Sequence, residues 1–433
     1  MTLVDQTIHQ KFFAQLSAHF QEVMHAAPSL SKPMRQKAWD HFAGLGLPLK
    51  KWEAFGYFPL SLFYEEIFKK PVRSSLPKGH LPPFEKKGST LVFINGEFSK
   101  ELSDISALQG QLVIMPLSDA YQTYGSFLHG RLDKTLKSET NPFASLNLAL
   151  ETKGLFVFVP PKIKVETPIH LVHYLSSERK ELFSPRIQLF IGKGSEMKCI
   201  TSTHDLNETG YWINGLLDIA LEEGSCLEMT SLLNVNEKGW HFDSVRATHK
   251  KNSRLDLLNF ISGGGIARQD FRIQLQGENA EAKLQGASLV KDHSQAHTHV
   301  FMGHESPHTH SSQLFKTILD GNAKSSFEGK IYVHKEAQKT EAYQSNHNLL
   351  LGHHAIAYSK PNLEIFADDV KASHGATIAK LKKDELFYLK TRGLSQEMAK
   401  ELLILAFSQE ITSQVAEPFI REQMQMKTRE FLQ

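Results

Sequence analysis

The sequence predicts a mainly β protein whose strands stack into a coil, a β-solenoid or β-helix, with an α-helical region at each end. Apolar or alternating runs of strand length recur from about residue 91 onward. Small corner sequences, in which a glycine or an acidic residue precedes Ala or Ser, separate several of these runs. Helical spacing of apolar residues is clear mainly before residue 70 and after residue 381. Together these observations favour a coil of strands between two helical segments.

The first region, residues 1–85, is expected to be helical. Phe12, Leu16, Phe20 and Val23 recur at three- and four-residue spacings, which places them on one face of a helix. A stretch rich in Pro, Lys and Ser follows between residues 70 and 83, and its composition is typical of a linker.

The central region, residues 86–378, is expected to form the coil. Helical windows are few here, which argues against an alternating α/β domain. The strand-length runs lie at 91–94, 112–115, 155–159, 169–174, 187–191, 255–260, 284–290, 330–333 and 363–366. The corner sequences lie at 192–195, 223–225, 277–280, 321–323 and 352–355.

The spacing of small residues favours a coil over other β architectures. Corner-like alanines at Ala323, Ala337, Ala355 and Ala372 fall 14, 18 and 17 residues apart, about one short strand plus its turns each time. A large β-sandwich is the alternative that the pattern leaves open.

The last region, residues 379–433, is expected to be helical again. A first helix ends at Gly393, a common type of helix cap. Ser395 begins a second helix with Met398 and Leu402 on one stripe, and a third, highly polar helix begins near residue 417. This region can pack back on the coil or present a face to another protein.

Composition limits the classes of partner and compartment. Lys+Arg 49 against Asp+Glu 47 gives a formal net charge of +2, which favours neither nucleic acid nor an anionic membrane. The two cysteines, Cys199 and Cys226, form no C-x-x-C motif, so neither a disulfide framework nor a zinc knuckle is indicated. The chain begins without a signal-peptide profile, and its longest apolar run, 402–407, is too short to span a bilayer. We expect a soluble protein of the reduced cytoplasm.

The motifs of common enzymes are missing. No G-x-x-x-x-G-K-[ST] occurs, and the glycine run at 263–265 is not followed by a phosphate-binding lysine. Neither G-x-S-x-G nor H-E-x-x-H is present. We therefore expect no enzymatic activity, and no ATP hydrolysis by this chain alone.

The segment 361–377 holds the candidate site. Residues 363–367 alternate as in a strand, after which Asp368-Asp369 suits a turn. Ser373-His374-Gly375 then places an imidazole beside a glycine, in backbone that can lie close to a partner or a ligand. Pattern alone leaves His374 open as a structural or a functional residue.

Histidine is also concentrated between residues 293 and 310. His297/His299 and His308/His310 are i, i+2 pairs that would project from one face of a strand. Neutral imidazoles in such pairs can bind Zn²⁺, Fe²⁺ or Ni²⁺. Hydrogen-bonded histidines on a β-surface are the competing interpretation, because no carboxylate or thiolate completes a recognisable ligand set. The full cluster is His293, His297, His299, His304, His308 and His310.

The order of motifs between residues 312 and 407 resembles that of the SufB/SufD family of iron–sulfur cluster assembly proteins. The resemblance continues more loosely upstream, at Asn95-Gly96, Leu146-Asn147 and Leu47-Pro48. Within the family it favours the SufD branch, because of the form of the motif around His374. The landmarks are Leu319-Asp320-Gly321, Phe327-Glu328-Gly329-Lys330, Gln338-Lys339-Thr340-Glu341-Ala342, Gln344-Ser345-Asn346, Asn348-Leu349-Leu350-Leu351, Leu363-Glu364-Ile365, Ala367-Asp368-Asp369-Val370, Ser373-His374-Gly375-Ala376-Thr377, Leu386-Phe387-Tyr388-Leu389 and Arg392-Gly393.

The resemblance implies a right-handed parallel β-helix flanked by helical regions, and a non-catalytic scaffold role. It implies pairing with SufB through the β-helix cores and binding of the ATPase SufC through residues 379–433, in a SufBC₂D complex. ATP would be bound by SufC. His374 would face a cysteine of SufB and ligate a transient Fe–S cluster at the interface, so this chain alone would hold no stable cofactor.

One departure from the family and two rival functions remain. Some SufD proteins carry a cysteine where this chain has Ala372, so His374 would act alone on this side or with Asp368, Asp369 or Glu364, which we interpret as turn or structural residues. A SufB-like homodimeric Fe–S scaffold is one rival, and the isolated chain could form a homodimer. A β-helix polysaccharide lyase is the other.

Overall fold

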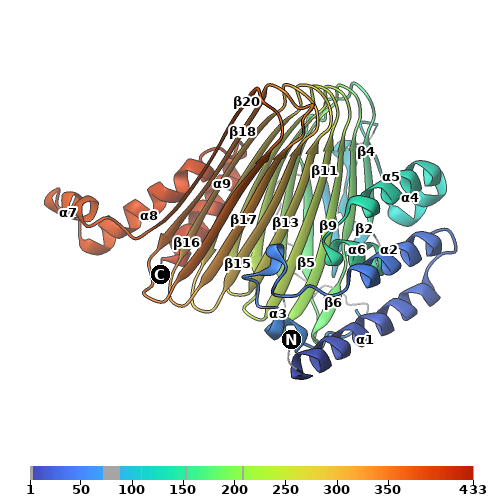
Figure 1. Ribbon diagram of the computed structural model, residues 1–433, viewed down its shortest axis with the longest axis horizontal. Helices are drawn as coiled ribbons and strands as arrows, with labels where there is room; N and C mark the ends of the chain where they lie inside the picture. Colours follow the sequence, from blue (N-terminus) through green and yellow to red (C-terminus); the bar gives the residue numbers. More distant parts are fainter. Residues whose placement is uncertain (1–2, 72–87, 109, 152–153, 207–208, 433) are drawn as a thin grey trace.

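Two facing β-sheets form the centre of the molecule, and helices cover their outer faces (Figure 1). The computed structural model describes residues 3–71, 88–108, 110–151, 154–206 and 209–432. The first sheet runs in the order β2-β1-β5-β8-β10-β12-β14-β16-β18-β20, and the second in the order β19-β17-β15-β13-β11-β9-β7-β4-β3, with β6 paired to β9. The strands of the first sheet are β1 (Thr90–Ile94), β2 (Glu97–Asp104), β5 (Ile169–Leu175), β8 (Glu196–Asp205), β10 (Cys226–Val235), β12 (Arg254–Gly263), β14 (Glu281–Val290), β16 (His310–Leu319), β18 (Thr340–Leu350) and β20 (Val370–Ala379). Those of the second are β3 (Val113–Pro116), β4 (Leu155–Val159), β6 (Glu181–Phe183), β7 (Arg186–Ile191), β9 (Tyr211–Leu221), β11 (Gly239–His249), β13 (Ile266–Leu275), β15 (Gln295–His304), β17 (Lys324–Val333) and β19 (Ile356–Ile365).

The chain forms a parallel β-solenoid of about eight turns. From β7 to β20 consecutive strands alternate between the sheets, and each strand pairs in parallel with the strand one coil later. Paired residues are 26 to 32 positions apart, for example Trp240 with Ile266 and Lys324 with Ile356. The predicted stacked coil is therefore confirmed, and the β-sandwich alternative is wrong because its strands would pair antiparallel.

The corners between strands lie where the sequence predicted them. Each of the five corner sequences connects a strand of one sheet to the next strand of the other. Ser195, Ser225 and Ala323 are buried there, since only a small side chain fits inside the tight bend. The expectation for Ala372 was wrong, because this residue lies within β20 and Ala367 occupies the corner.

The two ends of the solenoid differ. At the first end each sheet finishes with an antiparallel pair, β1 with β2 and β3 with β4. At the other end β19 and β20 each have a strand neighbour on one side only. We call the coil of β19 and β20 the open end.

Helices from the first part of the chain cover the outer face of the second sheet (Figure 1). An aromatic core including Phe63, Phe143, Trp212 and Phe242 joins them to β9 and β11. The predicted linker falls mostly outside the described residues, as does the expected boundary at 85. The expectation of few helices between 86 and 378 was wrong for residues 117–150. The helices are α1 (Leu3–Ala26), α2 (Lys32–Leu45), η1 (Glu53–Phe55), α3 (Leu60–Tyr64), η2 (Ser106–Leu108), α4 (Leu117–Thr123), α5 (Gly125–Ser138) and α6 (Pro142–Leu150).

Three helices follow the solenoid, α7 (Lys383–Thr391), α8 (Gln396–Thr412) and α9 (Pro418–Phe431); α8 and α9 pack on the outer face of the first sheet, and α7 projects away from it (Figure 1). Ile404 and Ile411 of α8 are buried against sheet residues such as Leu258 and Ile318. The predicted cap is confirmed, because Ser395 Oγ accepts a hydrogen bond from the N–H of Met398 at 3.1 Å. Among the described residues, no helix is long and apolar enough to cross a membrane.

Candidate functional site at the open end

His374 lies in the middle of β20, on the last strand of the first sheet, and its side chain is exposed. The sequence pattern did not predict this strand. Ala372, Gly375 and Ala376 are small, so they hide the alternation that marks a strand. The turn itself lies earlier, at Asp368 and Asp369, as predicted.

The imidazole of His374 belongs to the interior side of the coil. Two residues earlier on the same strand, Ala372 packs against the interior core, and side chains two apart share one face of a strand. His374 pairs in register with Gln344 of β18, and Gln344 pairs with Gln313 of β16. His374 is thus the last member of an interior column, exposed because no further coil covers it.

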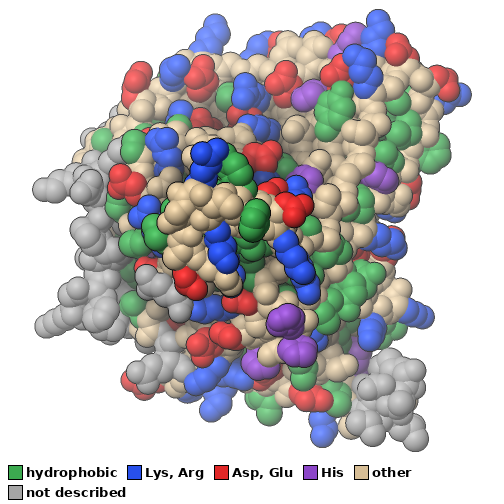
Figure 2. Space-filling view, turned by 90° about the vertical axis from the view of Figure 1, so that its left-hand side faces the viewer, with side chains coloured by type: hydrophobic (Ala, Val, Ile, Leu, Met, Phe, Trp, Pro, Cys, Tyr) green, Lys and Arg blue, Asp and Glu red, His purple; other side chains and the backbone are tan. Residues whose placement is uncertain are grey.

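Exposed hydrophobic side chains lie on the same last coil as His374. Ile365 and Ile378 occupy interior positions of β19 and β20, yet Ile378 is 51% exposed. Phe366 and Tyr358 add exposed aromatic surface. Figure 2, which views the molecule from the side of α7, shows hydrophobic and histidine side chains among the charged ones. An unpaired strand edge beside exposed core positions is typical of a surface that another β-structure covers.

Among the acidic residues close to His374 in the sequence, Glu364 pairs through its carboxylate and Asp369 bonds through its backbone. Glu364 forms an ion pair with Lys330 at 2.7 Å. The backbone of Asp369 accepts a hydrogen bond from the N–H of Lys339 at 2.6 Å and donates one to Gln338 Oε1 at 3.0 Å, which fixes the last corner. Within the described parts of the chain, no three His, Cys, Asp or Glu side chains gather closely enough to hold a metal ion. A metal bound by His374 would need ligands from outside this group.

Neither cysteine is placed to supply such a ligand. Cys199 is buried in the same interior column as His374, but at the far end, beside Ile169 and Met229. Burial raises the pKa of its thiol to about 12, so the thiol stays protonated at neutral pH. Burial raises the pKa of the Cys226 thiol as well, and the negative charge of Asp256 raises it further.

Three of the six histidines between 293 and 310, His297, His299 and His304, have side-chain hydrogen-bond partners. His297 and His299 share one face of β15, as predicted; His297 Nδ1 lies 2.8 Å from Ser326 Oγ, and His299 Nδ1 lies 3.0 Å from Asp270 Oδ2. His308 was wrongly predicted to share a strand with His310, because it lies in the turn before β16 with a φ of 58°. The arrangement supports the structural interpretation of this cluster.

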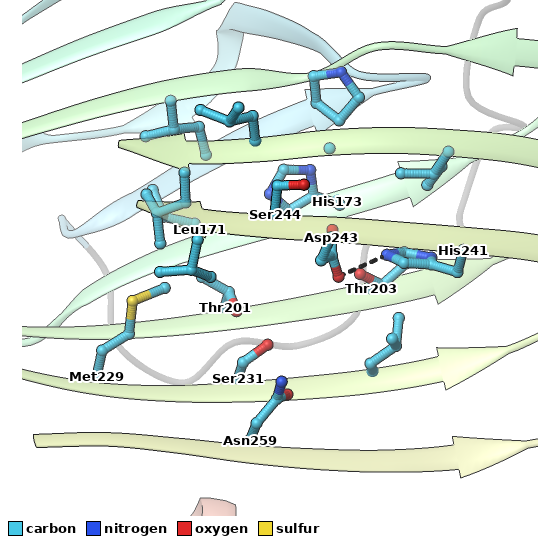
Figure 3. Close-up of a pocket in the computed structure, with 18 of the residues that line it drawn as sticks. Leu171, His173, Thr201, Thr203, Met229, Ser231, His241, Asp243, Ser244 and Asn259 are labelled. Atoms are coloured by element: carbon cyan, nitrogen blue, oxygen red, sulfur yellow. Dashed lines mark ion pairs between the residues drawn. The ribbon is translucent and has the colours of Figure 1, made fainter. Parts of the chain in front are cut away.

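An interior cavity of about 90 Å³ lies far from His374, in the first half of the solenoid (Figure 3). His241 Nε2 and Asp243 Oδ2 form an ion pair there at 2.9 Å. Burial lowers the pKa of His173, which also lines the cavity, to about 4. Ser231 and Asn259 add polar groups to the wall, so the cavity can hold a few ordered waters.

A second exposed apolar surface lies on the last helices. Phe387 and Tyr388 of α7 and Met398 and Leu402 of α8 are all exposed, Phe387 by 69%. We call these four residues the α7–α8 surface. No residue of α7 is buried, so packing within this chain does not explain its apolar side chains.

The molecule is a parallel β-solenoid with a histidine on its last strand and a projecting helical hairpin, and its exposed apolar surfaces are of the kind that protein partners cover. Comparison with known proteins specifies the family. Residues 173–407 match the family model for the SUF system FeS cluster assembly SufBD core domain, and residues 6–171 match the SufBD protein N-terminal region. The chain belongs to the SufB/SufD family.

Individual relatives agree over most of the chain. The iron–sulfur cluster assembly SufBD family protein slr0076 of Synechocystis is 30% identical over 88% of this chain and 86% of its own length. The iron–sulfur cluster assembly protein SufD of Escherichia coli is 26% identical over 90% of this chain and 91% of its own length. SufB of Bacillus subtilis is 22% identical over 90% and 87%, respectively.

Sequence reasoning proposed His374 as a candidate and gave no role to Gln344, its partner in the strand register. The two residues are 30 positions apart, and only the strand register brings them together. The glutamine was visible in the sequence only as one of the family landmarks.

Proposed function

We propose that this chain is a non-catalytic scaffold subunit in iron–sulfur cluster assembly, which pairs with a SufB-like protein at the open end. The observation that carries the proposal is the combination of unpaired β19 and β20 edges with exposed core positions such as Ile378. A partner solenoid placed against this end would continue both sheets and bury those side chains. Membership of the SufB/SufD family supports the type of partner.

We propose further that His374 supplies one ligand to a transient Fe–S cluster at that junction. The imidazole is exposed, lies at the end of the interior column, and has too few donors around it to form a complete site alone. Neutral imidazole is a competent iron ligand. A site divided between two chains would also break when the chains separate, which makes release controllable.

The α7–α8 surface is the proposed docking site for a SufC-like ATPase. Its apolar side chains project from the solenoid, and α8 is anchored to the first sheet through its opposite face. An ATPase bound there could transmit a movement to the sheet that contains His374. In this scheme ATP binds to the partner.

Co-expression with SufB-like and SufC-like proteins of the same source tests the assembly. We expect the three chains to co-purify as one complex. Purification of this chain without either partner, under conditions in which all three fold, would contradict the proposal.

The His374→Ala variant tests the site. We expect unchanged folding and unchanged co-purification, with loss of Fe–S delivery in cells that depend on this system. Ser373→Ala is a matched control on the opposite face of β20. Normal delivery by His374→Ala would remove His374 from the site.

The homodimeric scaffold alternative makes a different prediction. A chain that holds its own cluster should gain visible absorption and bound iron after anaerobic reconstitution in isolation. The buried thiol of Cys199 and the absence of a metal-holding group among the described residues favour the shared site instead.

A further inference from the structure

The neighbour of His374 in the interior column is a buried amide with an unfilled acceptor. Gln344 is 1% exposed. Its Nε2 donates a hydrogen bond of 2.8 Å to Oε1 of Gln313. Within the described parts of the chain, its own Oε1 is buried and has no hydrogen-bond partner. Buried carbonyl oxygens nearly always accept a hydrogen bond. The unpaired Oε1 of Gln344 therefore calls for a donor that does not contact it in this structure.

The opposite wall of the coil is shaped around this amide. Gly329 of β17 faces Gln344 across the interior, and a Cβ at position 329 would lie 2.3 Å from Gln344 Nε2 and 2.7 Å from its Oε1. Any larger residue at 329 would displace the amide. The interior therefore has room for the glutamine side chain only because position 329 is glycine.

His374 lies within reach of the unfilled oxygen. It pairs in register with Gln344, and neighbouring strands are about 4.8 Å apart. Both side chains project to the interior side of the coil. A ring N–H of His374 can therefore donate to Gln344 Oε1. The hydrogen bond from Gln344 Nε2 to Gln313 Oε1 leaves that oxygen available as the acceptor.

We propose that Gln344 is the positioning residue of His374. Its Oε1 accepts the N–H of one imidazole nitrogen, which selects one tautomer and presents the lone pair of the other nitrogen at the open end. Histidine ligands of metals commonly donate their second N–H to such an oxygen, which fixes the orientation of the ring. The metal-binding consequence rests on the proposed function, whereas the selection of the tautomer does not.

The tautomer of His374 can be measured in the full-length chain without any metal. We propose ¹⁵N labelling at histidine and long-range ¹H–¹⁵N correlation spectra near pH 8, where free imidazole is neutral. The signals of His374 are identified by their loss in His374→Ala. We expect one tautomer to predominate by roughly five- to tenfold, as a single net hydrogen bond supports.

Substitution of the glutamine gives the decisive comparison. In Gln344→Met, which keeps the length and loses the oxygen, both tautomers should be comparably populated. Gln188→Met, an equally buried glutamine on β7 at the other end of the solenoid, controls for the general effect of losing a buried amide. An unchanged tautomer ratio in Gln344→Met would overturn the proposal.

Delivery of Fe–S clusters separates this inference from the proposed function. If His374→Ala is defective and Gln344→Met delivers about 10–100-fold less than wild type, both stand. If His374→Ala delivers normally, the proposed role of His374 fails, and the tautomer ratio still decides the role of Gln344. Wild-type delivery by Gln344→Met beside a defective His374→Ala would show that cluster delivery does not use this contact.

Discussion

At the scale of single residues, burial lowers the pKa of several histidines of the solenoid. His304 is fully buried, with Nδ1 2.8 Å from Thr309 Oγ1 and Nε2 2.9 Å from Ser311 Oγ. Burial lowers its pKa to about 3, with a further contribution from His310. Burial likewise lowers the pKa of His297 to about 3. Such residues make the folded state sensitive to acid, because the unfolded chain binds protons that the folded chain excludes.

The His304→Gln variant should reduce this sensitivity. The pKa of His304 is lower when folded than its unfolded value near 6.5, so its favourable effect is fully present above pH 6.5 and declines as the pH falls toward 3. Titration of His304 should make the free energy of unfolding of the wild type roughly 2 kcal/mol lower at pH 5 than at pH 7.5. Glutamine does not titrate, so the variant should lack this loss. Urea unfolding at both pH values measures the difference. An equal loss of stability in both proteins on acidification would contradict the assignment.

The fit between Gly329 and Gln344 predicts a coupled pair of substitutions. Gly329→Ala should cost about 1–3 kcal/mol of the free energy of unfolding, because the new methyl group meets the Gln344 amide. Gln344→Ala should remove most of that penalty in the double variant. Gly375→Ala is the control, since a Cβ there meets only Ser345 Oγ, at 4.0 Å. Additive effects of the two substitutions would argue against the contact.

At the scale of secondary-structure elements, α8 uses two faces for different purposes. Ile404 lies on the buried face and Leu402 on the exposed one. Lys316 of β16 strengthens the attachment, because its ammonium group donates to the carbonyl oxygen of Phe407 at 3.0 Å. Only the buried face contributes to folding of the isolated chain.

A pair of truncations separates these two faces. Ile404→Ala should destabilise the chain by about 2–5 kcal/mol, as for other buried isoleucines. Phe387→Ala should change stability by less than about 0.5 kcal/mol and should weaken co-purification of a SufC-like ATPase. Thermal unfolding and pull-down measure the two effects. Loss of stability in Phe387→Ala would show that α7 is part of the fold.

The elements that sequence could predict are those with a local signal. The corners at 192–195 and 321–323 were visible because glycine and a small residue are required at each bend. Strand β18 was not predicted, because its interior positions carry Gln344 and Asn346 instead of apolar residues, and only the neighbouring coil makes those amides acceptable. Helix α5 was also not predicted, although its apolar residues form a regular helical stripe, Leu128, Leu132 and Leu136.

The candidate site was predictable only in part. The motif around His374 pointed to the residue as a candidate, while its position in a strand, its interior orientation and its register with Gln344 and Gln313 depend on how the strands pair. Register follows from how many residues each coil contains, which no local pattern encodes. Long-range pairing therefore marks the limit of the sequence prediction.

At the scale of the whole molecule, the open end governs association. The isolated chain exposes interior positions such as Ile378 on its last coil, and a second copy can cover them when no other partner is present. We propose that the isolated chain forms a homodimer through this end.

Ile378→Lys should convert such a homodimer to a monomer, because burying the lysine in the interface would desolvate its charge. Its effect on the stability of the monomer should stay within about 0.5 kcal/mol, since the position is half exposed. Met426→Lys, an exposed site on α9, is the control. Sedimentation velocity over a range of protein concentrations measures the effect. Persistence of the dimer in Ile378→Lys would place the interface elsewhere.

The order of the strands in the chain also sets the order in which the coils are synthesised. Each strand of a coil pairs with the edge of the coil before it. The antiparallel pairs at the first end, β1 with β2 and β3 with β4, come earlier in the chain than the parallel coils that follow them. A growing chain leaving the ribosome thus offers a finished template to every new strand. The strand that carries His374 is the last strand to be synthesised, so the candidate site can form only after every other strand of the solenoid has left the ribosome.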